Sequence, residues 1–310
     1  AKVIQKGSTP AGMHISICVK EILEFLQITP GQIGLDATLG YGGHTLEMLK
    51  CLNSKGHLYS IDVDPIELPR TKNRLERLGY GPEILDIRQM NFSQIDQIAF
   101  EVGPFDFVLA DLGVSSMQID NPERGFSYKS DGPLDLRLNP EMDKSITSRL
   151  KQISFDELNG MLIENADEPY SVEIARAIIA NIKKGIEIVT TTQLRNIIND
   201  ALKSLPQINE DEIKKSCQRC FQALRIDIND EFEVLDELLE KLPAILAKGG
   251  RVAILTFHSG EDGRVKKSFK HFLKEGIYCE IAPNPIRPSS EECHINSRAR
   301  SAKLRWAIKA

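Results

Sequence analysis

The stretch IGLDATLGYGGHT, residues 33–45, places a glycine-rich turn between a short apolar run and the start of a helical pattern. A strand, a glycine turn and a helix in this order open the nucleotide site of a doubly wound sheet. Glycine lets the backbone approach a ligand where a Cβ atom would clash. A second apolar run ends at Asp62, whose carboxylate can accept both hydroxyls of a ribose. The alternative is an ordinary turn between a strand and a helix.

The glycine spacing differs from the dinucleotide fingerprint G-x-G-x-x-G, because Asp36 precedes Gly40, Gly42 and Gly43. We expect Asp36 to give the mouth of the pocket negative charge, which suits a ligand with a cationic amine better than one with phosphates. S-adenosylmethionine is such a ligand. A nicotinamide oxidoreductase is the weakest alternative, because the glycine spacing does not fit it.

The overall composition is that of a soluble globular protein, with 310 residues, 41% hydrophobic and 27% charged. The net charge of −5 argues against a general nucleic-acid coat. Residues 251–310 nevertheless carry 12 Lys and Arg against 6 Asp and Glu, which is either a local footprint for RNA or a solvated surface. With no long apolar run, we expect no membrane contact and a cytoplasmic location. Because the chain begins with Ala1, a removed leader and an organellar matrix stay as the alternative.

Six cysteines are scattered through the chain, and only Cys217 and Cys220 form a C-x-x-C pair. A zinc site needs four ligands at close quarters, and helical residues follow this pair directly. We therefore expect reduced thiols and no metal.

The rhythm of apolar runs predicts a parallel sheet interrupted by a helical segment. A first helix is expected over 16–27. Strands are expected over 33–37, 57–62, 84–89, 104–111, 251–257 and 304–308, with helices over 46–53, 65–78 and 229–246. No strand pattern is found between about 113 and 218, where residues 154–203 look helical. We therefore predict one α/β domain, residues 1–112 and 219–310, split after its fourth strand by an insertion, residues 113–218. Such an insertion follows a strand end, where open sheets bind ligands.

Several blocks in one order carry a resemblance to a known family. They are DLGVSSMQ at 111–118, PERGFS at 122–127, DGPLDLR at 131–137, FQALRI at 221–226, NDE at 229–231, GGR at 249–251, FHS at 257–259 and NSRARSAKLR at 296–305. Together with the turn they resemble the RsmH/MraW family over nearly the whole chain. The resemblance implies an α/β, Rossmann-like class I methyltransferase sheet with an inserted all-helical, substrate-recognition domain after strand 4. It also implies an S-adenosylmethionine-dependent methyltransferase acting on cytosine N4 of small-subunit (16S) ribosomal RNA, near the decoding centre.

The resemblance also implies which residues bind the cofactor. The family's cofactor positions correspond to Gly42, Gly43, His44, Asp62, Phe92, Asp111 and Gln118, and we add Gly40 from the turn. Asp62 would bind the ribose hydroxyls, and Phe92 would give an aromatic edge for adenine. By itself, Phe92 could equally be a core aromatic.

Asp111 ends the fourth strand and is our candidate for catalysis. Cytosine N4 is a weak nucleophile, because its lone pair is conjugated into the ring. Methyl transfer needs this amine to be oriented and needs an acceptor for its protons. The alternative is that Asp111 only orients the cofactor. Attack from N4 requires no cysteine nucleophile.

Candidates for contacts with bases and phosphates follow from the same blocks. They are Ser115, Ser116, Arg137, Asn229, His258, Arg298 and Arg300. Ser259 and Asp262 have the spacing of a helix capping box. Since alternate residues of a strand share a face, Arg298 and Arg300, or Lys303 and Arg305, could form a pair directed at phosphate.

Three segments depart from the family pattern: HISI at 14–17, NADE at 165–168 and GEDG at 260–263. They spare the cofactor positions, so they bear on the nucleotide that is modified and not on the class of reaction. The alternatives are therefore another RNA or DNA base, or a cofactor-binding ribosome-assembly factor with little catalysis. The expected partner is small-subunit ribosomal RNA or the assembled small subunit, and a homodimer is a further option.

Overall fold

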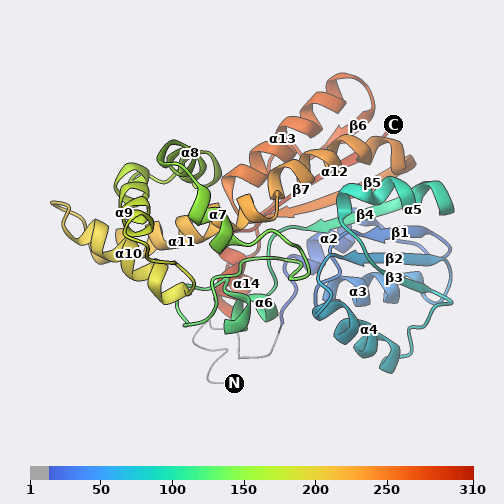
Figure 1. Cartoon of the computed structure of the whole chain (residues 1–310). Helices are drawn as coiled ribbons and strands as arrows, with labels where there is room; N and C mark the ends of the chain where they lie inside the picture. Colours follow the sequence, from blue (N-terminus) through green and yellow to red (C-terminus); the bar gives the residue numbers. More distant parts are fainter. Residues whose placement is uncertain (1–13) are drawn as a thin grey trace. The chain divides into compact units, whose positions relative to one another are not determined.

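The computed structural model describes residues 14–310, and its described part contains a seven-stranded sheet with the order β3-β2-β1-β4-β5-β7-β6 (Figure 1). The strands are β1 Ile33–Asp36, β2 His57–Asp62, β3 Leu85–Gln89, β4 Phe105–Asp111, β5 Leu246–Thr256, β6 Tyr278–Ile281 and β7 Lys303–Lys309. Strands β1 to β5 are parallel, whereas β7 is antiparallel to both β5 and β6. The predicted α/β, Rossmann-like sheet is confirmed. The sequence analysis missed β6, which has only four residues at the edge of the sheet and no clear alternation.

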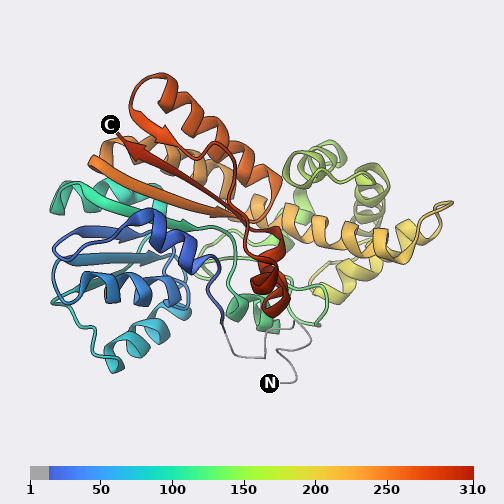
Figure 2. The ribbon, with the colours of Figure 1, turned by 180° about the vertical axis from the view of Figure 1, so that it is seen from behind.

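Both faces of the sheet are covered, and the alternation of side chains along β4 and β5 shows this directly. Val108 and Ile254 belong to one core, whereas Leu109 and Leu255 belong to another. The first core is completed by α5 Ile95–Val102, α12 Glu231–Ile245 and α13 Ser259–Lys274, and the second by α2 Val19–Leu26, α3 Gly43–Leu52 and α4 Glu67–Arg77. Figures 1 and 2 show these two layers of helices. Strands buried on both faces explain the nearly continuous apolar runs in the sequence.

The chain divides into two compact units, residues 1–115 with 232–310 and residues 116–231. The second unit is helical and has its own apolar core. Its helices are α6 Ser116–Asp120, α7 Ile146–Gln152, α8 Phe155–Ala166, α9 Ser171–Lys183, α10 Thr191–Lys203 and α11 Glu210–Ile228. Three of these begin with a capping box, at Ser154, Thr190 and Asn209, which fixes where each helix starts.

The predicted end of the insertion, at residue 218, needs correction. Helix α11 continues without a break to Ile228, and its Cys220, Phe221 and Leu224 are buried in the helical core. The second unit therefore ends at Glu231. The length of α11 explains the error, because this helix has 19 residues and continues through the block at 221–226, past the predicted boundary.

Shorter elements complete the first unit. They are the 3₁₀ turn η1 Phe92–Gln94, helix α14 Ser290–Ile295 and the 3₁₀ turn η3 Ser297–Ser301. Within residues 14–310, none of the helices combines the length and the apolar character that a membrane span requires.

Candidate active site at the carboxyl ends of the parallel strands

The turn after β1 is held by two glycines at positions of close approach. Gly42 has a φ of 87°, and a Cβ atom there would lie 2.8 Å from Cγ2 of Thr71. A Cβ atom on Gly43 would lie 1.9 Å from Oγ of Ser16. The backbone of the turn therefore packs closely against α4 and against the segment before α2, and larger side chains would displace it.

Asp36 does not line the mouth of a pocket, so this part of the sequence analysis was wrong. Its side chain is completely buried and accepts hydrogen bonds from the backbone N–H of Thr38 at 3.0 Å and from the hydroxyl of Thr45 at 2.6 Å. Thr45 in turn lies 2.9 Å from Oγ of Ser60. Burial raises the pKa of Asp36. Asp36 thus ties the end of β1 to α3 and β2 and has a structural role.

Helix α4 also holds the turn, through two residues that the sequence analysis did not single out. The hydroxyl of Thr71 donates to the carbonyl of Gly40 at 2.5 Å. Arg74 donates to the carbonyl of Tyr41 at 3.1 Å, and its guanidinium lies 3.9 Å from the centre of the Tyr41 ring. Their spacing of three, which puts both on one face of a helix, was the only signal in the sequence.

Asp62, at the end of β2, is placed as predicted beside the glycine turn. Its Oδ2 accepts the N–H of Gly40 at 2.8 Å, and its Oδ1 accepts the N–H of Asp64 at 3.0 Å. Burial raises the pKa of Asp62 to about 6, although these two backbone donors oppose the rise. Each carboxylate oxygen has used one lone pair here, so each can still accept one more hydrogen bond.

Asp111 ends β4, and its position is fixed from both sides. Its backbone N–H donates to the hydroxyl of Thr38 at 2.7 Å, and its Oδ2 lies 3.5 Å from Nδ1 of His44. The side chain keeps 22% of its surface exposed. Burial raises the pKa of Asp111 to about 6; nearby His44 lowers it, whereas Asp36 and Glu261 raise it. A carboxyl group with this pKa exchanges protons near neutral pH, which suits a proton acceptor.

His44, in the first turn of α3, is nearly buried at 7% exposure. Its Nε2 lies 2.8 Å from the carbonyl oxygen of Ile17, in the segment before α2. The imidazole therefore bridges Ile17 and Asp111. The resemblance gave His44 only a cofactor role, and nothing in the sequence indicated this bridge.

The other predicted cofactor residues lie in different places. Phe92 begins η1 directly after β3 and is half-buried against the core of the sheet. Gln118 is buried in α6, which belongs to the second unit, and Ser116 begins the same helix. Ser115 is the last residue of the first unit before that helix. Contact of these residues with a ligand stays a prediction.

The end of β5 carries a histidine and a buried acid. Nε2 of His258 lies 3.0 Å from Oε1 of Glu261, while Oε2 of Glu261 accepts the N–H of Phe257 at 2.9 Å. Nδ1 of His258 is buried, with no hydrogen-bond partner among the described residues. The predicted capping box is wrong: α13 begins at Ser259 with His258 as its N-cap, and no side chain caps it.

The arginines near the end of the chain also differ from the prediction. Arg305 is buried and donates to both carboxylate oxygens of Asp262, at 2.7 and 3.2 Å, and Nζ of Lys303 lies 3.6 Å from Asp262. Although burial opposes it, Arg305 keeps the pKa of Asp262 below its usual value. A Lys303–Arg305 pair directed at phosphate is therefore excluded by this geometry. Arg298 and Arg300 lie in η3 and not on a strand, so strand alternation does not apply to them.

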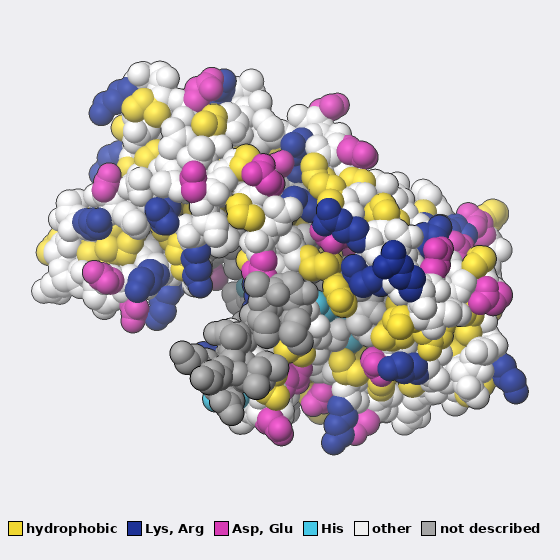
Figure 3. All heavy atoms as spheres, turned by 90° about the horizontal axis from the view of Figure 1, so that it is seen from below, with side chains coloured by type: hydrophobic (Ala, Val, Ile, Leu, Met, Phe, Trp, Pro, Cys, Tyr) yellow, Lys and Arg dark blue, Asp and Glu magenta, His cyan; other side chains and the backbone are white. Residues whose placement is uncertain are grey.

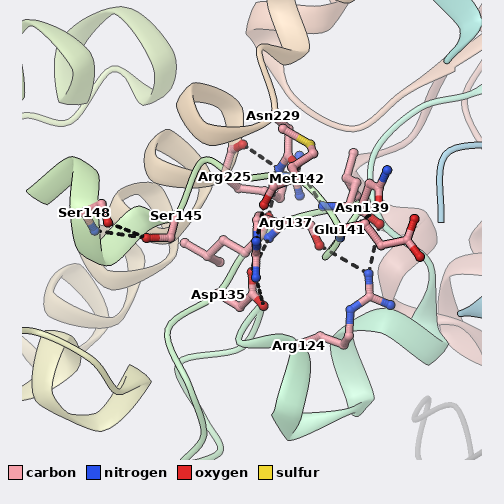
Figure 4. A network of polar contacts seen from close by, with 12 residues as sticks. Arg124, Asp135, Arg137, Asn139, Glu141, Met142, Ser145, Ser148, Arg225 and Asn229 are labelled. Atoms are coloured by element: carbon pink, nitrogen blue, oxygen red, sulfur yellow. Dashed lines mark hydrogen bonds and ion pairs between the residues drawn. The ribbon is translucent and has the colours of Figure 1, made fainter. Parts of the chain in front are cut away.

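In the second unit, Arg137 and Asn229 belong to a network that holds the Leu136 loop, residues 135–142 (Figure 4). Asn229 accepts the N–H of Leu138 and donates to the carbonyls of Leu136 and Arg225, each at 2.8 Å. Arg137 donates to Asp135 at 2.6 and 3.2 Å, and also to the carbonyl of Met142. Both amide hydrogens of Asn229 are thus used inside the protein, so its predicted contact with a base has one oxygen lone pair left to make it.

Arg124 holds the same loop from the other side. It is buried, and it donates to the carbonyls of Arg137 and Leu138 at 3.2 and 3.0 Å. Leu136, in the same loop, is completely buried and has a φ of 64°, a left-handed conformation that a leucine seldom adopts. Such strain persists only where the surroundings over-determine the backbone.

The six cysteines are all free thiols. Cys217 and Cys220 are buried in the helical core, and burial raises the pKa of each thiol, which makes them poor nucleophiles and metal ligands. Sγ of Cys18 and carboxylate oxygens of Glu21 and Glu292 lie within 4.8 Å of one another. Glu292 also accepts the backbone N–H of Cys18, the N-cap of α2, at 2.8 Å. This hydrogen bond is a sufficient reason for Glu292 to lie beside Cys18.

The residues of the first unit fit a ligand with a ribose and a cationic centre. Asp62 offers two open acceptor positions at the end of β2, and Asp111 offers a carboxylate that is 22% exposed at the end of β4. Between these strands, the turn at Gly40–Gly43 brings bare backbone to the same edge of the sheet. In open α/β sheets this edge is where ligands bind.

Comparison with known proteins identifies the family. The model of the MraW methylase family matches residues 11–310. The chain is 78% identical to "Ribosomal RNA small subunit methyltransferase H 2" of Alkaliphilus metalliredigens, over all of this chain and 89% of that protein. It is 69% identical to "Ribosomal RNA small subunit methyltransferase H 1" of Lachnoclostridium phytofermentans, over all of this chain and 85% of that protein. A relative in Halothermothrix orenii, "Ribosomal RNA small subunit methyltransferase H", is 36% identical over 95% of this chain and 97% of its own length. The chain therefore belongs to the MraW methylase family.

Proposed function

We propose that this protein transfers the methyl group of S-adenosylmethionine to the exocyclic N4 of a cytosine in small-subunit (16S) ribosomal RNA, near the decoding centre. Membership of a methylase family and the printed names of its relatives support methylation of small-subunit ribosomal RNA. The observation that carries the proposal for an amine target is Asp111, a mostly buried carboxyl group with a raised pKa at the end of β4. An amine that is methylated must lose a proton, and Asp111 can accept it.

Residues of the first unit would hold the cofactor. Asp62 would accept the ribose hydroxyls with its open lone pairs, and the backbone at Gly40–His44 would lie along the methionyl part. Phe92 would flank the adenine at the end of β3. When bound, the cofactor supplies an electrophilic methyl group on a sulfonium.

Asp111 would do two things at the reacting amine. Its carboxylate would accept a hydrogen bond from N4, turning the lone pair of the amine out of conjugation with the ring. It would then take the proton that N4 loses. Positioning and proton transfer are each enough to change a rate by several orders of magnitude.

The second unit would recognise the RNA, with Arg137, Ser116 and the rigid loop around Leu136 among its contacts. In the first unit, Ser115, His258, Arg298 and Arg300 are the corresponding candidates. On the face shown in Figure 3, Lys and Arg side chains are interspersed with Asp and Glu. Mixed charge of this kind favours a substrate presented by an assembled particle over general binding to RNA. We also propose a cytoplasmic location, because the relatives are named as ribosomal RNA methyltransferases.

The test is to identify the product. Small ribosomal subunits from a strain lacking this gene are incubated with the protein and methyl-labelled S-adenosylmethionine, and the RNA is digested to nucleosides for mass spectrometry. We expect label in N4-methylcytidine. Label in another nucleoside would show that the target is a different base. Binding of the cofactor with no label in RNA or DNA would favour an assembly factor. Naked RNA in a parallel reaction tells whether the assembled subunit is required.

A thermal shift checks the cofactor class independently of the RNA. A saturating ligand at about 100 times its Kd stabilises the folded state by about 2.7 kcal/mol. We expect S-adenosylmethionine to raise the Tm and NAD to leave it unchanged. A rise in Tm with NAD and none with S-adenosylmethionine would contradict the proposal that the turn at Gly40–Gly43 binds S-adenosylmethionine.

A further inference from the structure

We infer that His44 is a positioning residue for Asp111, which it holds through one shared proton while its other ring nitrogen is anchored on the backbone. This inference rests on the proposed function for its consequence in catalysis. It gives the side chain of His44 a role in the protein, in place of a contact with the cofactor.

The hydrogen bond to Ile17 fixes the protonation of one ring nitrogen. A backbone carbonyl oxygen can only accept, so Nε2 of His44, 2.8 Å away, must carry a hydrogen. The same bond orients the ring, and burial at 7% exposure restricts other rotamers. Nδ1 is then directed at Oδ2 of Asp111, at 3.5 Å.

The contact between Nδ1 and Asp111 is attractive only when a proton lies between them. That proton resides on His44 as an imidazolium facing a carboxylate, or on Asp111 as a carboxyl group facing a neutral ring. With no proton, two lone pairs face each other. A proton on Nδ1 of His44 therefore orients Asp111 as a carboxylate.

The surroundings of the pair are mainly acidic. A second histidine, His14, also acts on His44, and its own pKa is lowered to about 4 by burial and then by His44, so it is neutral near pH 7. Acidic neighbours favour the shared-proton state, because they disfavour an extra negative charge on Asp111. The groups that act on Asp111 or His44 are Asp36 on β1, Glu261 on α13, Glu292 on α14, and Cys18 and His14 before or at the start of α2.

The pair has a defined place in the proton balance of the reaction. N4 gains the methyl carbon as the bond from that carbon to sulfur breaks, and N4 loses one proton to the carboxylate of Asp111. Water removes this proton from Asp111 before the next turnover. Turnover starts from Asp111 as a carboxylate, held by the proton on Nδ1 of His44, so the rate should fall on the acid side of neutrality, near the pKa of about 6 of Asp111.

Two amide substitutions separate the two ends of the ring. In His44→Gln, the amide nitrogen occupies the place of Nε2, so the bond to Ile17 is kept and the donor to Asp111 is lost. In His44→Asn, the amide nitrogen occupies the place of Nδ1, so a donor to Asp111 is kept and the bond to Ile17 is lost. His271→Gln, on the exposed part of α13, is the matched control.

The pH dependence of kcat on small ribosomal subunits distinguishes positioning from a structural role. For His44→Gln we expect kcat to fall about tenfold and its acid limb to move up by about one pH unit, because Asp111 loses its favourable partner. For His44→Asn we expect the limb to stay at or below its wild-type position and kcat to be partly restored. An acid limb unchanged in His44→Gln would overturn the inference, even if stability or cofactor affinity changed.

Nitrogen-15 NMR of the imidazoles tests the pair without kinetics. In the wild-type protein we expect Nε2 of His44 to be protonated throughout, and the Nδ1 signal to shift markedly in Asp111→Asn but not in His271→Gln. A bare Nε2, or an Nδ1 signal indifferent to Asp111, would overturn the inference. Because this experiment needs no RNA, it decides the inference even if the wild-type protein makes no N4-methylcytidine, a result that would refute the proposed function alone.

Discussion

The strand ends of the first unit and the Leu136 loop of the second unit use polar side chains in opposite ways. Asp62 and Asp111 keep lone pairs open, are partly exposed and have raised pKa values. In the loop, Asn229 uses both amide hydrogens on the protein itself, and Arg137 uses one N–H of each guanidinium nitrogen in the same way. Open hydrogen-bonding capacity marks where a ligand can be bound, whereas saturated capacity marks where a backbone is held rigid.

Removing the amide of Asn229, which holds the Leu136 loop, should have the largest effect on stability. Asn229→Ala leaves the carbonyl of Leu136 and the N–H of Leu138 without their partner, and each unpaired buried group costs about 1–3 kcal/mol. We expect the free energy of unfolding of the second unit to fall by about 2–4 kcal/mol, measured by urea denaturation. The exposed Gln152→Ala, at the end of α7, serves as the control. Equal stability of the two variants would show that the loop is not held in this way.

Neutralising Asp62, the acid at the end of β2, should weaken ligand binding. Asp62→Asn keeps an acceptor for only one of the N–H groups of Gly40 and Asp64, because its amide nitrogen donates, and it loses the charged acceptors for the ribose. A hydrogen bond to a charged group contributes about 1.5–3 kcal/mol, so we expect the Kd for S-adenosylmethionine to rise about tenfold to a hundredfold. Calorimetry measures this directly. A rise of less than twofold would place the ribose elsewhere.

The raised pKa values also predict how stability depends on pH. A folded-state carboxyl group with a pKa of about 6 binds its proton more tightly than the unfolded chain, where Asp titrates near 3.8. Asp62 and Asp111 therefore make the folded state less stable as pH rises from about 4 to about 6, with no further change above that. We expect the difference in unfolding free energy between wild type and Asp62→Asn to change over this window. A constant difference would contradict the raised pKa of Asp62.

The sequence predicted the parallel sheet and the helical insertion because the apolar residues of the strands and of the helices follow clear patterns. Apolar runs ending in Asp62 and Asp111 predicted parallel strands and the edge at which their side chains gather, and the structure confirmed both. The sequence did not show which side chains contact one another in the folded protein. Asp36 had the residue type of a ligand-binding acid, but Thr45 and Ser60 bury it, and Arg305 had the type of a phosphate ligand, but Asp262 engages it. The contact of His44 with Ile17 depends on how the segment before α2 packs, which no local pattern encodes.

The role of Asp111 is tested most directly by a single-turnover reaction on small ribosomal subunits, with wild type and Asp111→Asn compared at equal occupancy by S-adenosylmethionine. Nucleosides are resolved by mass spectrometry at each time point. We predict that wild type forms N4-methylcytidine and that the substitution slows its formation by about 10²–10⁴-fold, the usual contribution of a proton acceptor. N4-methylcytidine formed at a comparable rate by both proteins, or label found only in another nucleoside, would contradict the account.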